Sequence, residues 1–339
     1  MIKIAVIGAG MTGLTIAHHL KHVAQVQIFE KSRGLGGRMA TRRGDNTSFD
    51  HGAQYFVAKS PEFKAFLQEP LSAGVISEWR ARFQEIDGRT GATLAERTWG
   101  DGYPHYVGTP SMNALVKYLA MELEVHRETQ VAKIDRTDNH LWCLRSDQNA
   151  VFGQYDWVIL TCPPEQAAAL LPHSCSFKSD LSNIELLPCY AVMLAFDNPC
   201  DLRFDAALIR HADISWVAQN NTKPKRGACQ SVVIQSNNEW AKENLERDID
   251  GVKSHLIQET QRVLGVDLGQ AVHSDIHRWK YANTIIQRTH HGDVFLDTTL
   301  GLGAAGDWCG NARVESAFLH GKKLAEAVVH TLKCSGIGL

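Results

Sequence analysis

Apolar runs and amphipathic stretches alternate along the chain, and their order predicts its elements. Residues 2–8, IKIAVIG, form a short β-branched run without polar alternation, which is typical of a buried strand. Residues 11–21 follow with a helical pattern, and residues 26–31, VQIFEK, form a predicted second strand in which Glu30 comes near the end. This order predicts the start of a Rossmann-type α/β domain.

Helices and turn-rich segments follow. A helix over about residues 61–67 is predicted, with Ser60 as its N-cap and proline at its first position. Residues 86–110 contain many Gly, Pro and Thr and are predicted to be loops. A helix over about residues 111–123 is predicted next, capped by its first serine.

The second half of the chain is richer in strand patterns. Residues 130–161 predict a meander of three strands, and Pro163 and Pro164 end it and begin a short helix. Residues 186–237 are rich in Val, Ala, Ile and Tyr and predict several strands. Residues 272–282, VHSDIHRWKYA, predict another strand.

Two later segments have regular apolar stripes. Residues 240–264 predict one long amphipathic helix with the stripe Leu245, Ile249, Val252, Leu256 and Val263. The last helix is predicted to begin near Val314 or Glu315. Its apolar face comprises Phe318, Gly321, Leu324, Ala325, Val328 and Leu332. Because the first strand and the last helix lie at opposite ends of the chain, one sheet is predicted to be assembled from both termini.

Composition narrows the possible partners. The 339 residues suit about two domains of roughly 150 residues each. A net charge of −2 gives no overall attraction to nucleic acid or to an anionic membrane. Eight cysteines without a C-x-x-C pair predict free thiols, and no metal site is expected. Without a run of ~18 apolar residues or a signal-peptide pattern, a cytoplasmic location is expected.

The first predicted turn has a phosphate-binding pattern. Gly8, Gly10 and Gly13 form G-x-G-x-x-G between a strand and a helix, and Glu30 follows at the end of the next strand. The glycines allow a tight turn, close approach to a pyrophosphate and close packing of helix on strand. Glu30 can accept hydrogen bonds from a ribose diol. A dinucleotide site is predicted, although this motif alone does not separate NAD from FAD.

Two further segments favour FAD. Gly36, Gly37 and Arg38 follow Glu30 closely, and an arginine there can make a bidentate contact to an anion. Near the C-terminus, Asp307 can accept a hydrogen bond from a ribityl hydroxyl. The last helix starts just beyond it and would direct its positive end toward the flavin ring. The two ends of the chain thus suit the two ends of one long cofactor.

These segments together resemble a known family. IAVIGAGMTGL, EKSRGLGGRM, DHGAQYF, VGTPSMNALVKYLA, HRWKYA and AAGDWCGNARVESAFLHGKKLA are similar to motifs of the renalase-like branch of the flavin amine oxidase superfamily, in particular its bacterial members. The motifs extend over residues 4–327. The terminal motifs occur in many flavin oxidases, whereas GGRM, GAQYF and HRWKYA narrow the resemblance to the renalase-like group.

The resemblance implies an α/β fold of two domains, p-hydroxybenzoate hydroxylase-like, with a Rossmann-type FAD-binding domain and an inserted mixed-sheet α+β substrate domain. We expect the first to comprise residues 1–55, 105–170 and 285–339, and the second residues 56–104 and 171–284. It also implies non-covalent FAD. The substrate would be a dihydronicotinamide isomer of NAD(P)H reduced at the 2- or 6-position, which passes a hydride to flavin N5, and O2 would then yield H2O2.

The FAD contacts of Thr12, Arg38, Gln54 and Tyr55, and the adenine contact of Val131, are implied by the resemblance. The complete set of predicted cofactor-binding residues is Gly8, Ala9, Gly10, Met11, Thr12, Gly13, Glu30, Lys31, Ser32, Gly37, Arg38, Met39, Gln54, Tyr55, Phe56, Val131, Gly306, Asp307, Arg313, Val314, Glu315 and Ala317.

The chain departs from the family pattern at two positions. Ser316 and His320 stand where relatives often have Gly and Ser, which puts the approach of the last helix to the flavin in question. Cys309 lies in the ribityl-binding loop and outside the segment that carries the thioether in covalent amine oxidases. We therefore expect no covalent link.

Hydride transfer from a dihydropyridine requires orientation at ~3–3.5 Å and no strong base. Trp279 is the first candidate for the flavin face, and Tyr55, Phe56 and Tyr190 are candidates for the pocket wall, although each suits plain packing equally well. Trp279, Tyr55 and Tyr190 are the predicted catalytic residues. The alternatives are an oxidase of a small amine or polyamine and a non-catalytic protein stabilised by FAD. An NAD-dependent dehydrogenase is disfavoured by GGRM and GDWCGNARVESA. The oligomeric state stays open.

Overall fold

The structure is a computed structural model that describes residues 1–44, 47–100, 102–284 and 294–334. The chain forms two compact units. Unit 1 comprises Met1–Gly37, Val116–Leu186 and Thr284–Leu339, and unit 2 comprises Arg38–Leu115 and Leu187–Asn283.

Unit 1 is built on a six-stranded sheet with the order β19-β20-β13-β1-β2-β9. All its neighbouring pairs are parallel except β19 and β20. The strands are β1 (Lys3–Ile7), β2 (Gln25–Phe29), β9 (Glu124–His126), β13 (Trp157–Leu160), β19 (Phe295–Asp297) and β20 (Leu302–Ala304). The sheet therefore joins both ends of the chain, which confirms the prediction from the element order.

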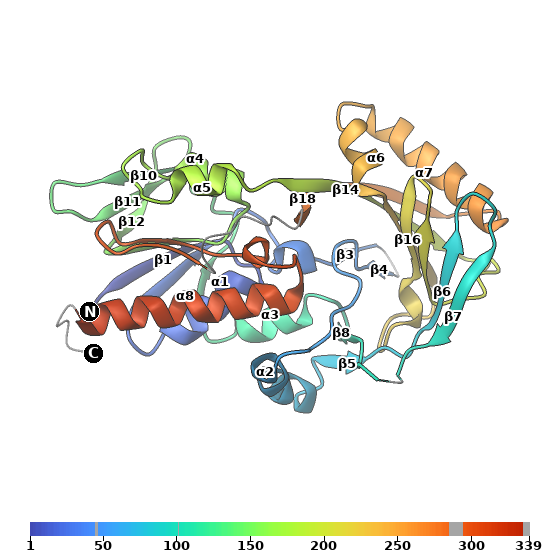
Figure 1. The fold of residues 1–339 in the computed structure, drawn as a ribbon, viewed down its shortest axis with the longest axis horizontal. Coiled ribbons are helices and arrows are strands. Elements are labelled where there is room, and N and C mark those ends of the chain that lie inside the picture. Colours follow the sequence, from blue (N-terminus) through green and yellow to red (C-terminus); the bar gives the residue numbers. More distant parts are fainter. Residues whose placement is uncertain (45–46, 101, 285–293, 335–339) are drawn as a thin grey trace. The chain divides into compact units, whose positions relative to one another are not determined.

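Two helices from opposite ends of the chain pack together in unit 1. α1 (Met11–Leu20) and α8 (Val314–Cys334) lie side by side, blue and red in Figure 1. The predicted apolar face of α8 is buried as expected, and Gly321 gives the close approach. A Cβ atom there would lie 2.9 Å from the Thr12 carbonyl oxygen.

The remaining elements of unit 1 are shorter. β10 (Lys133–Arg136), β11 (Trp142–Arg145) and β12 (Val151–Tyr155) form an antiparallel sheet. The meander prediction holds for β10 and β11. Its third strand, expected over residues 155–161, is β13, which pairs with β1 and β20 because its four residues are apolar and buried. β12, which was not predicted, is the third strand of the antiparallel sheet. The helices are α4 (Pro164–Leu170), α5 (Lys178–Ser182) and the 3-10 helix η3 (Asp307–Cys309).

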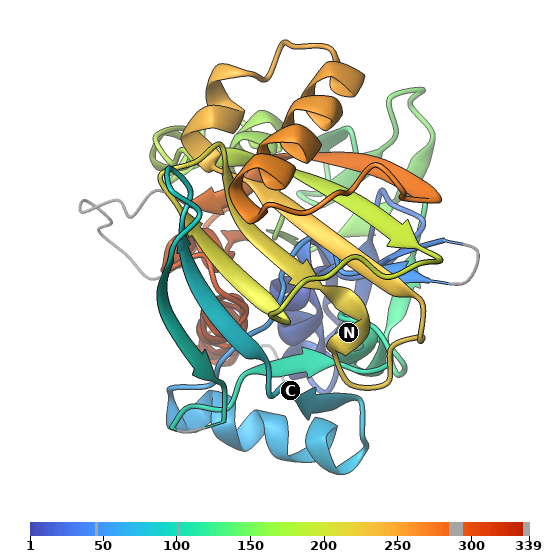
Figure 2. The same cartoon turned by 90° about the vertical axis from the view of Figure 1, so that its right-hand side faces the viewer.

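Unit 2 contains a seven-stranded sheet with the order β18-β14-β17-β16-β15-β6-β7. Figure 2 shows α7 (Ile249–Leu264) lying across one face of it. The strands are β6 (Arg82–Asp87), β7 (Thr93–Thr98), β14 (Leu186–Phe196), β15 (Ala206–Arg210), β16 (Ile214–Gln219), β17 (Gln230–Ser236) and β18 (His273–Thr284). The strands expected over 186–237 and 272–282 are thus present.

Smaller elements complete unit 2. They are η1 (Gly37–Met39), β3 (Arg42–Arg43), β4 (Ser48–Phe49), α2 (Pro61–Ser72), β5 (Ile76–Glu78), β8 (Tyr106–Gly108), η2 (Asn220–Thr222) and α6 (Asn238–Glu243). Two elements cross the unit boundary: η1 begins at the last residue of this part of unit 1, and α3 (Ala114–Leu119) leads from unit 2 back into unit 1. Ser60 caps α2 by accepting from the Phe63 amide at 3.2 Å, as predicted.

Three predicted elements are wrong in extent or type. Residues 86–110 are not all loop, because β6 and β7 form a hairpin and β8 follows. The helix over 111–123 is shorter, limited to α3. The helix over 240–264 is two helices, because Asp248 caps α7 by accepting from the Gly251 amide at 2.9 Å. Ile249 is consequently exposed.

The unit boundaries also differ from those predicted. Residues 38–55 and 105–115 belong to unit 2, and residues 171–186 belong to unit 1. The first difference arises because Asp50 pairs with Lys223 and Arg226 inside unit 2. The second arises because the Ser176 amide donates to Asp297 at 3.0 Å in unit 1. In the described part of the chain, no helix is both long and apolar enough to span a membrane.

Replacing Gly321 by alanine tests the α1–α8 contact. We expect Gly321→Ala to lower Tm by roughly 3–8 °C, because the added methyl overlaps the Thr12 carbonyl oxygen. Gly251→Ala is the matched control in α7, where a Cβ meets only Asp248 at 3.5 Å and helix propensity improves. Thermal unfolding of both variants checks this, and an unchanged Tm for Gly321→Ala would contradict it.

Candidate cofactor and substrate sites

The turn between β1 and α1 in unit 1 has the geometry of a phosphate loop. Gly8 has a φ of +111°, which L side chains rarely adopt. At Gly13 a Cβ atom would lie 2.1 Å from the Gly8 carbonyl oxygen, so glycine is needed for α1 to begin this close to β1. The first N–H groups of α1 then point toward the loop.

Open space lies beside Gly10. A Cβ atom there would meet no atom within 4 Å, and the residue has an extended backbone as the N-cap of α1. The Gly36 amide donates to the Ala9 carbonyl at 3.0 Å, and a Cβ on Gly37 would lie 3.8 Å from Gly10 Cα. Free space at a helix N-terminus between two glycine loops fits a pyrophosphate, so these residues suit a dinucleotide.

Glu30, the predicted ribose ligand, lies beside this loop. Its buried carboxylate accepts from the Ala9 amide at 2.9 Å and the Ser32 amide at 2.8 Å. Each oxygen keeps a further lone pair for a ribose hydroxyl. The Thr129 amide donates to the Glu30 carbonyl at 2.9 Å, which brings the loop that leads to Val131 alongside. This arrangement supports the predicted adenine contact.

Three other predicted residues of unit 1 have different surroundings. Met11 and Thr12 are buried in the first turn of α1, so they would bind a phosphate through their backbone N–H groups and not through their side chains. Lys31 is exposed, with its ammonium nitrogen 3.3 Å from Gln166 Oε1. These roles stay predictions.

The C-terminal turn gathers the second predicted group of unit 1: Gly306, Asp307, Arg313, Val314, Glu315 and Ala317. The Asp307 carbonyl accepts from the Gly310 amide at 3.0 Å and the Ala312 amide at 3.1 Å, which folds the turn back on itself. The Ala317 amide donates to the Arg313 carbonyl at 2.9 Å as α8 begins. The turn thus places the Asp307 backbone next to a helix N-terminus.

Ser316 and His320, the two departures from the family pattern, bind this turn to α8. Ser316 Oγ donates to the Asp307 carbonyl at 3.1 Å, and His320 Nδ1 lies 2.7 Å from the Ser316 carbonyl oxygen. A Cβ on Gly310 would lie 2.5 Å from Ser316 Oγ. The two side chains therefore fill the space beside Gly310 and fix the turn, a role that the family pattern did not indicate.

In unit 2, the segment from Phe49 to Phe56 crosses the sheet face opposite α7. Phe49 stacks on His273 of β18 at 5.4 Å between ring centroids and packs on Met193 and Val233. The Gly52 carbonyl accepts from Gln235 of β17 at 2.7 Å. Further along, Tyr55 reaches Trp216 of β16 at 5.7 Å. The segment thus passes from β18 across β14 and β17 to β16.

Trp279 lies at the β18 end of this segment. Its indole nitrogen donates to the His51 carbonyl at 2.9 Å, and its ring stacks on the His51 ring at 5.1 Å. Burial, followed by His277 and Arg42, lowers the pKa of His51 to about 4. Burial and then Arg42 also lower the pKa of His277. Both imidazoles are therefore neutral at physiological pH.

Tyr55 lies at the other end, in an aromatic cluster. Its ring is 4.7 Å from Trp99 and 5.0 Å from His105, and these two stack on each other at 3.9 Å. Phe83 packs on Trp99 and Trp216. Tyr55 is half-buried in this cluster. The sequence pattern did not reveal Trp99, His105 or Trp216.

Tyr190 lies on the opposite face of the sheet. It is fully buried in the core beneath α7, and its hydroxyl donates to the Asn244 carbonyl at 3.0 Å. Met193, three residues along β14, points to the Phe49 face instead. The structure therefore does not bring Tyr190 together with Tyr55 and Trp279, and its surroundings are those of a packing residue.

The other predicted cofactor-binding residues of unit 2 make contacts within unit 2. The Arg38 carbonyl accepts from the Ala53 amide at 2.9 Å, and a guanidinium nitrogen of Arg38 donates to the Ala282 carbonyl at 3.2 Å. Phe56 is buried against Phe63, and Met39 is buried too. Their contacts to a cofactor stay predictions.

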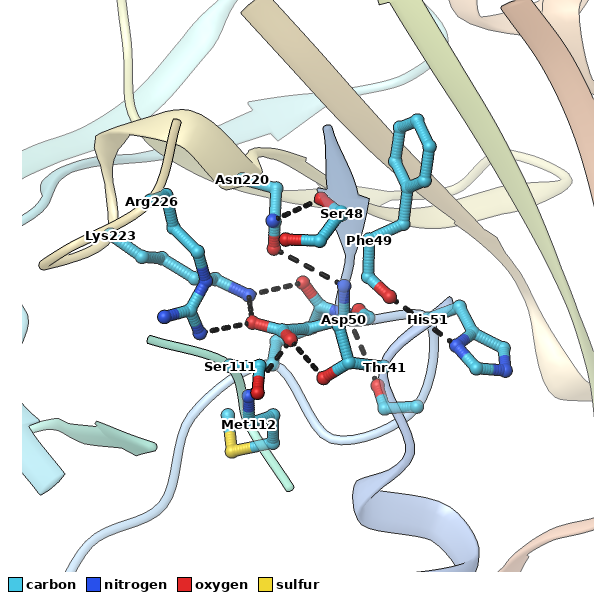
Figure 3. Close-up of polar contacts among 12 residues, drawn as sticks. Thr41, Ser48, Phe49, Asp50, His51, Ser111, Met112, Asn220, Lys223 and Arg226 are labelled. Carbon is cyan, nitrogen blue, oxygen red and sulfur yellow. Dashed lines mark hydrogen bonds and ion pairs between the residues drawn. The ribbon is translucent and has the colours of Figure 1, made fainter. Parts of the chain in front are cut away.

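A buried ion cluster lies under the same segment (Figure 3). Asp50 Oδ2 accepts from Arg226 at 2.6 Å and from Lys223 at 3.2 Å, and its Oδ1 accepts from Thr41 at 2.6 Å and the Met112 amide at 3.0 Å. Burial by itself raises the pKa of Asp50. Lys223 and Arg226 lower it by more, so that the pKa of Asp50 is about 2. These partners could not be predicted, because Lys223 and Arg226 stand in a proline-containing basic run that suggests a solvated turn.

Comparisons with known proteins agree with this architecture. Residues 6–70 match the NAD(P)-binding Rossmann-like domain, and residues 79–329, well over half of the chain, match the flavin containing amine oxidoreductases. A stretch of 52 residues is 48% identical to 4,4'-diapophytoene desaturase of Staphylococcus aureus (strain Newman), which is 15% of this chain and 10% of the desaturase. The chain therefore spans only about a tenth of the curated relatives that it matches.

Solved structures resemble the whole chain in fold. A protein assigned as a protoporphyrinogen oxidase of Exiguobacterium sp. 255-15 has a TM-score of 0.78 at 13% identity, over 98% of this chain and 99% of that chain. A putrescine oxidase triple mutant has a TM-score of 0.69 at 12% identity, over 97% and 99%. An oxidoreductase from Methanosarcina mazei has 0.68 at 15%, over 96% and 100%. At these identities the likeness is one of fold.

The open space at Gly10 gives a test of the dinucleotide site. We expect Gly10→Val to fold normally, because its backbone is extended and its Cβ meets no atom, but to lose at least about tenfold in cofactor affinity by filling the phosphate position. Gly34→Val is the matched control, since a Cβ at Gly34 also meets nothing within 4 Å. Cofactor released on denaturation, measured per protein, checks this. Equal retention by both variants would contradict it.

Proposed function

Since the chain belongs to the flavin containing amine oxidoreductase family, we propose that this FAD-dependent oxidoreductase oxidises dihydronicotinamide nucleotides reduced at the 2- or 6-position. The assignment to the renalase-like branch is part of the proposal. Phosphates of FAD are assigned to the Gly8–Gly13 loop, the ribose to Glu30, and the ribityl chain and flavin to the turn at Asp307.

The charge around residues 38–56 carries the proposal. This segment contains three arginines and two aspartates, and its ion-pair partners add Lys223, Arg226 and Asp275. The sequence of this segment and its described ion-pair partners together contain five cationic groups and three carboxylates, a net charge of +2. Nucleotide phosphates are anions, whereas most small amines are cations at pH 7, so this surplus favours the nucleotide and disfavours the amine.

The aromatic residues of unit 2 support the same substrate class. Tyr55, with Trp99 and Trp216 behind it, offers a flat apolar surface on which a nicotinamide ring can stack. Trp279 is fixed by its bond to the His51 carbonyl and offers a second ring. We assign to these side chains the orientation of the substrate ring, as hydride transfer requires.

We assign no residue as a general acid or base in this reaction. His51 and His277 are neutral and buried, and oxidation of a dihydropyridine to the aromatic nicotinamide requires only loss of a hydride. FAD, when bound, supplies the two-electron acceptor, and O2 takes the two electrons and two protons to give H2O2. The chain's own residues bind, orient and exclude water.

Anaerobic reduction tests the proposal. We expect 2- or 6-dihydronicotinamide isomers to bleach the flavin band at least about 100-fold faster than putrescine and other amines, because the site favours an anionic, planar donor. Stopped-flow absorbance measures both rates, and H2O2 is measured once air enters. Bleaching by an amine alone would favour the alternative, an amine oxidase. Flavin that no donor reduces would favour a non-catalytic role.

The pH dependence separates the same alternatives. With His51 at a pKa of about 4 and the pKa of His277 also lowered, we expect a reduction rate that changes by less than about twofold from about pH 6.5 to about 7.5. An amine substrate must lose its proton first, so its rate would rise about tenfold per pH unit over this range. A rising profile with the dihydronicotinamide isomers would contradict the assignment of neutral histidines.

A further inference from the structure

The cluster around Asp50 contains one more cation than it needs. The side chains of Asp50, Lys223 and Arg226 are 0%, 0% and 1% exposed, so one carboxylate stands with two cations away from water. Arg226, Thr41 and the Met112 amide already supply three donors to the carboxylate, and Arg226 is the closer cation. A one-to-one pair would leave no net charge. Lys223 makes the longer and weaker of the two ion pairs with Asp50, so we regard its ammonium group as the surplus charge.

The buried lysine is also unfavourable for stability. The pKa of Lys223 is lowered to about 8, mainly by burial. Asp50 raises this pKa and Arg226 lowers it further. In the unfolded chain its pKa is near 10.5, so the protonated form destabilises the folded state below pH 8, and this is relieved as the pH rises toward 10.5. Lys223 is therefore poorly explained by stability alone.

The ammonium group has a second partner, which points to its role. Lys223 Nζ lies 3.3 Å from Gln54 Oε1, and the Gln54 amide nitrogen donates to the carbonyls of Asp50 and Gly52, the latter at 3.1 Å. Lys223 Nζ also lies 5.3 Å from the Trp79 ring centroid. Both ends of the Gln54 amide are thus held, and Tyr55 is the next residue. Among the described residues, the charged groups that face Lys223 are Asp50 and Arg226.

We propose that Lys223 is a positioning residue: its ammonium group holds the Gln54 side chain and so fixes the backbone that presents Tyr55 to the substrate. The inference rests on the proposed function for the role of Tyr55. The order of residues 50–56 is a separate property that can be measured without any substrate.

Lys223→Met removes the surplus charge and keeps the length of the side chain. We expect Tm to stay within about 2 °C or to rise, because Asp50 and Arg226 remain as a balanced pair. Hydrogen exchange of amides 52–56 should become at least about tenfold faster, with α7 unchanged as internal reference. Lys225→Met, at an exposed lysine two residues away, is the matched control and should change neither quantity.

The flavin reduction rate gives a second readout. In the parent protein we expect the rate to fall as the pH rises through about 8, and in Lys223→Met to be about tenfold lower and free of this step. Lys223→Arg, which stays charged, should restore the rate at pH 7 and also lack the step. If no tested donor reduces the flavin, the proposed function fails while the exchange result still decides the role of Lys223.

Asp50→Asn shows how much stability is lost when the charges of the cluster are unbalanced, since it leaves two buried cations without a carboxylate. We expect it to lower Tm by on the order of 10 °C or to prevent folding. The positioning role is overturned if Lys223→Met leaves exchange at 52–56 unchanged. It is equally overturned if Lys223→Met destabilises the protein as much as Asp50→Asn and speeds exchange throughout, since Lys223 would then be structural.

Discussion

One buried carboxylate constrains the organisation of unit 2. Asp50 cannot be kept from water without donors, and its donors are Thr41, the Met112 amide, Lys223 and Arg226. These residues come from three stretches that are far apart in the sequence. Since an ionised group left without partners would be strongly destabilising, the stretches must meet wherever Asp50 is buried. The segment across the sheet face, with His51 and Tyr55, takes its position from this requirement.

Unit 1 depends on a different constraint, the close approach of backbones. Gly13 against Gly8 and Gly321 against the first turn of α1 both lack the side chain that would separate them. The result is a helix N-terminus with free space in front of it. A side-chain site for phosphates is not required, because N–H groups and the helix dipole suffice.

Local signals were enough to predict much of this fold. The G-x-G-x-x-G turn, Glu30 after β2, the Ser60 cap and the apolar face of α8 each depend on neighbouring residues. The hairpin of β6 and β7 was missed because every residue of β7 is exposed, so it has no apolar alternation. The break before α7 was missed because Asp248 fits a solvent-exposed helix position as well as a cap. The partners of Asp50, Tyr55 and Trp279 are set by tertiary packing and have no signal within any short window.

The interleaving of the two units has a consequence for synthesis on the ribosome. The last strand of unit 2, β18, ends at Thr284, whereas β19, β20 and α8 of unit 1 come later. Unit 2 therefore has all its strands before the unit 1 sheet can be completed. β1 and α1, which are synthesised first, lack their neighbours in unit 1 until β19, β20 and α8 have been synthesised. Under the proposed assignment of FAD to unit 1, its site is therefore completed only after the strands of unit 2 have been made.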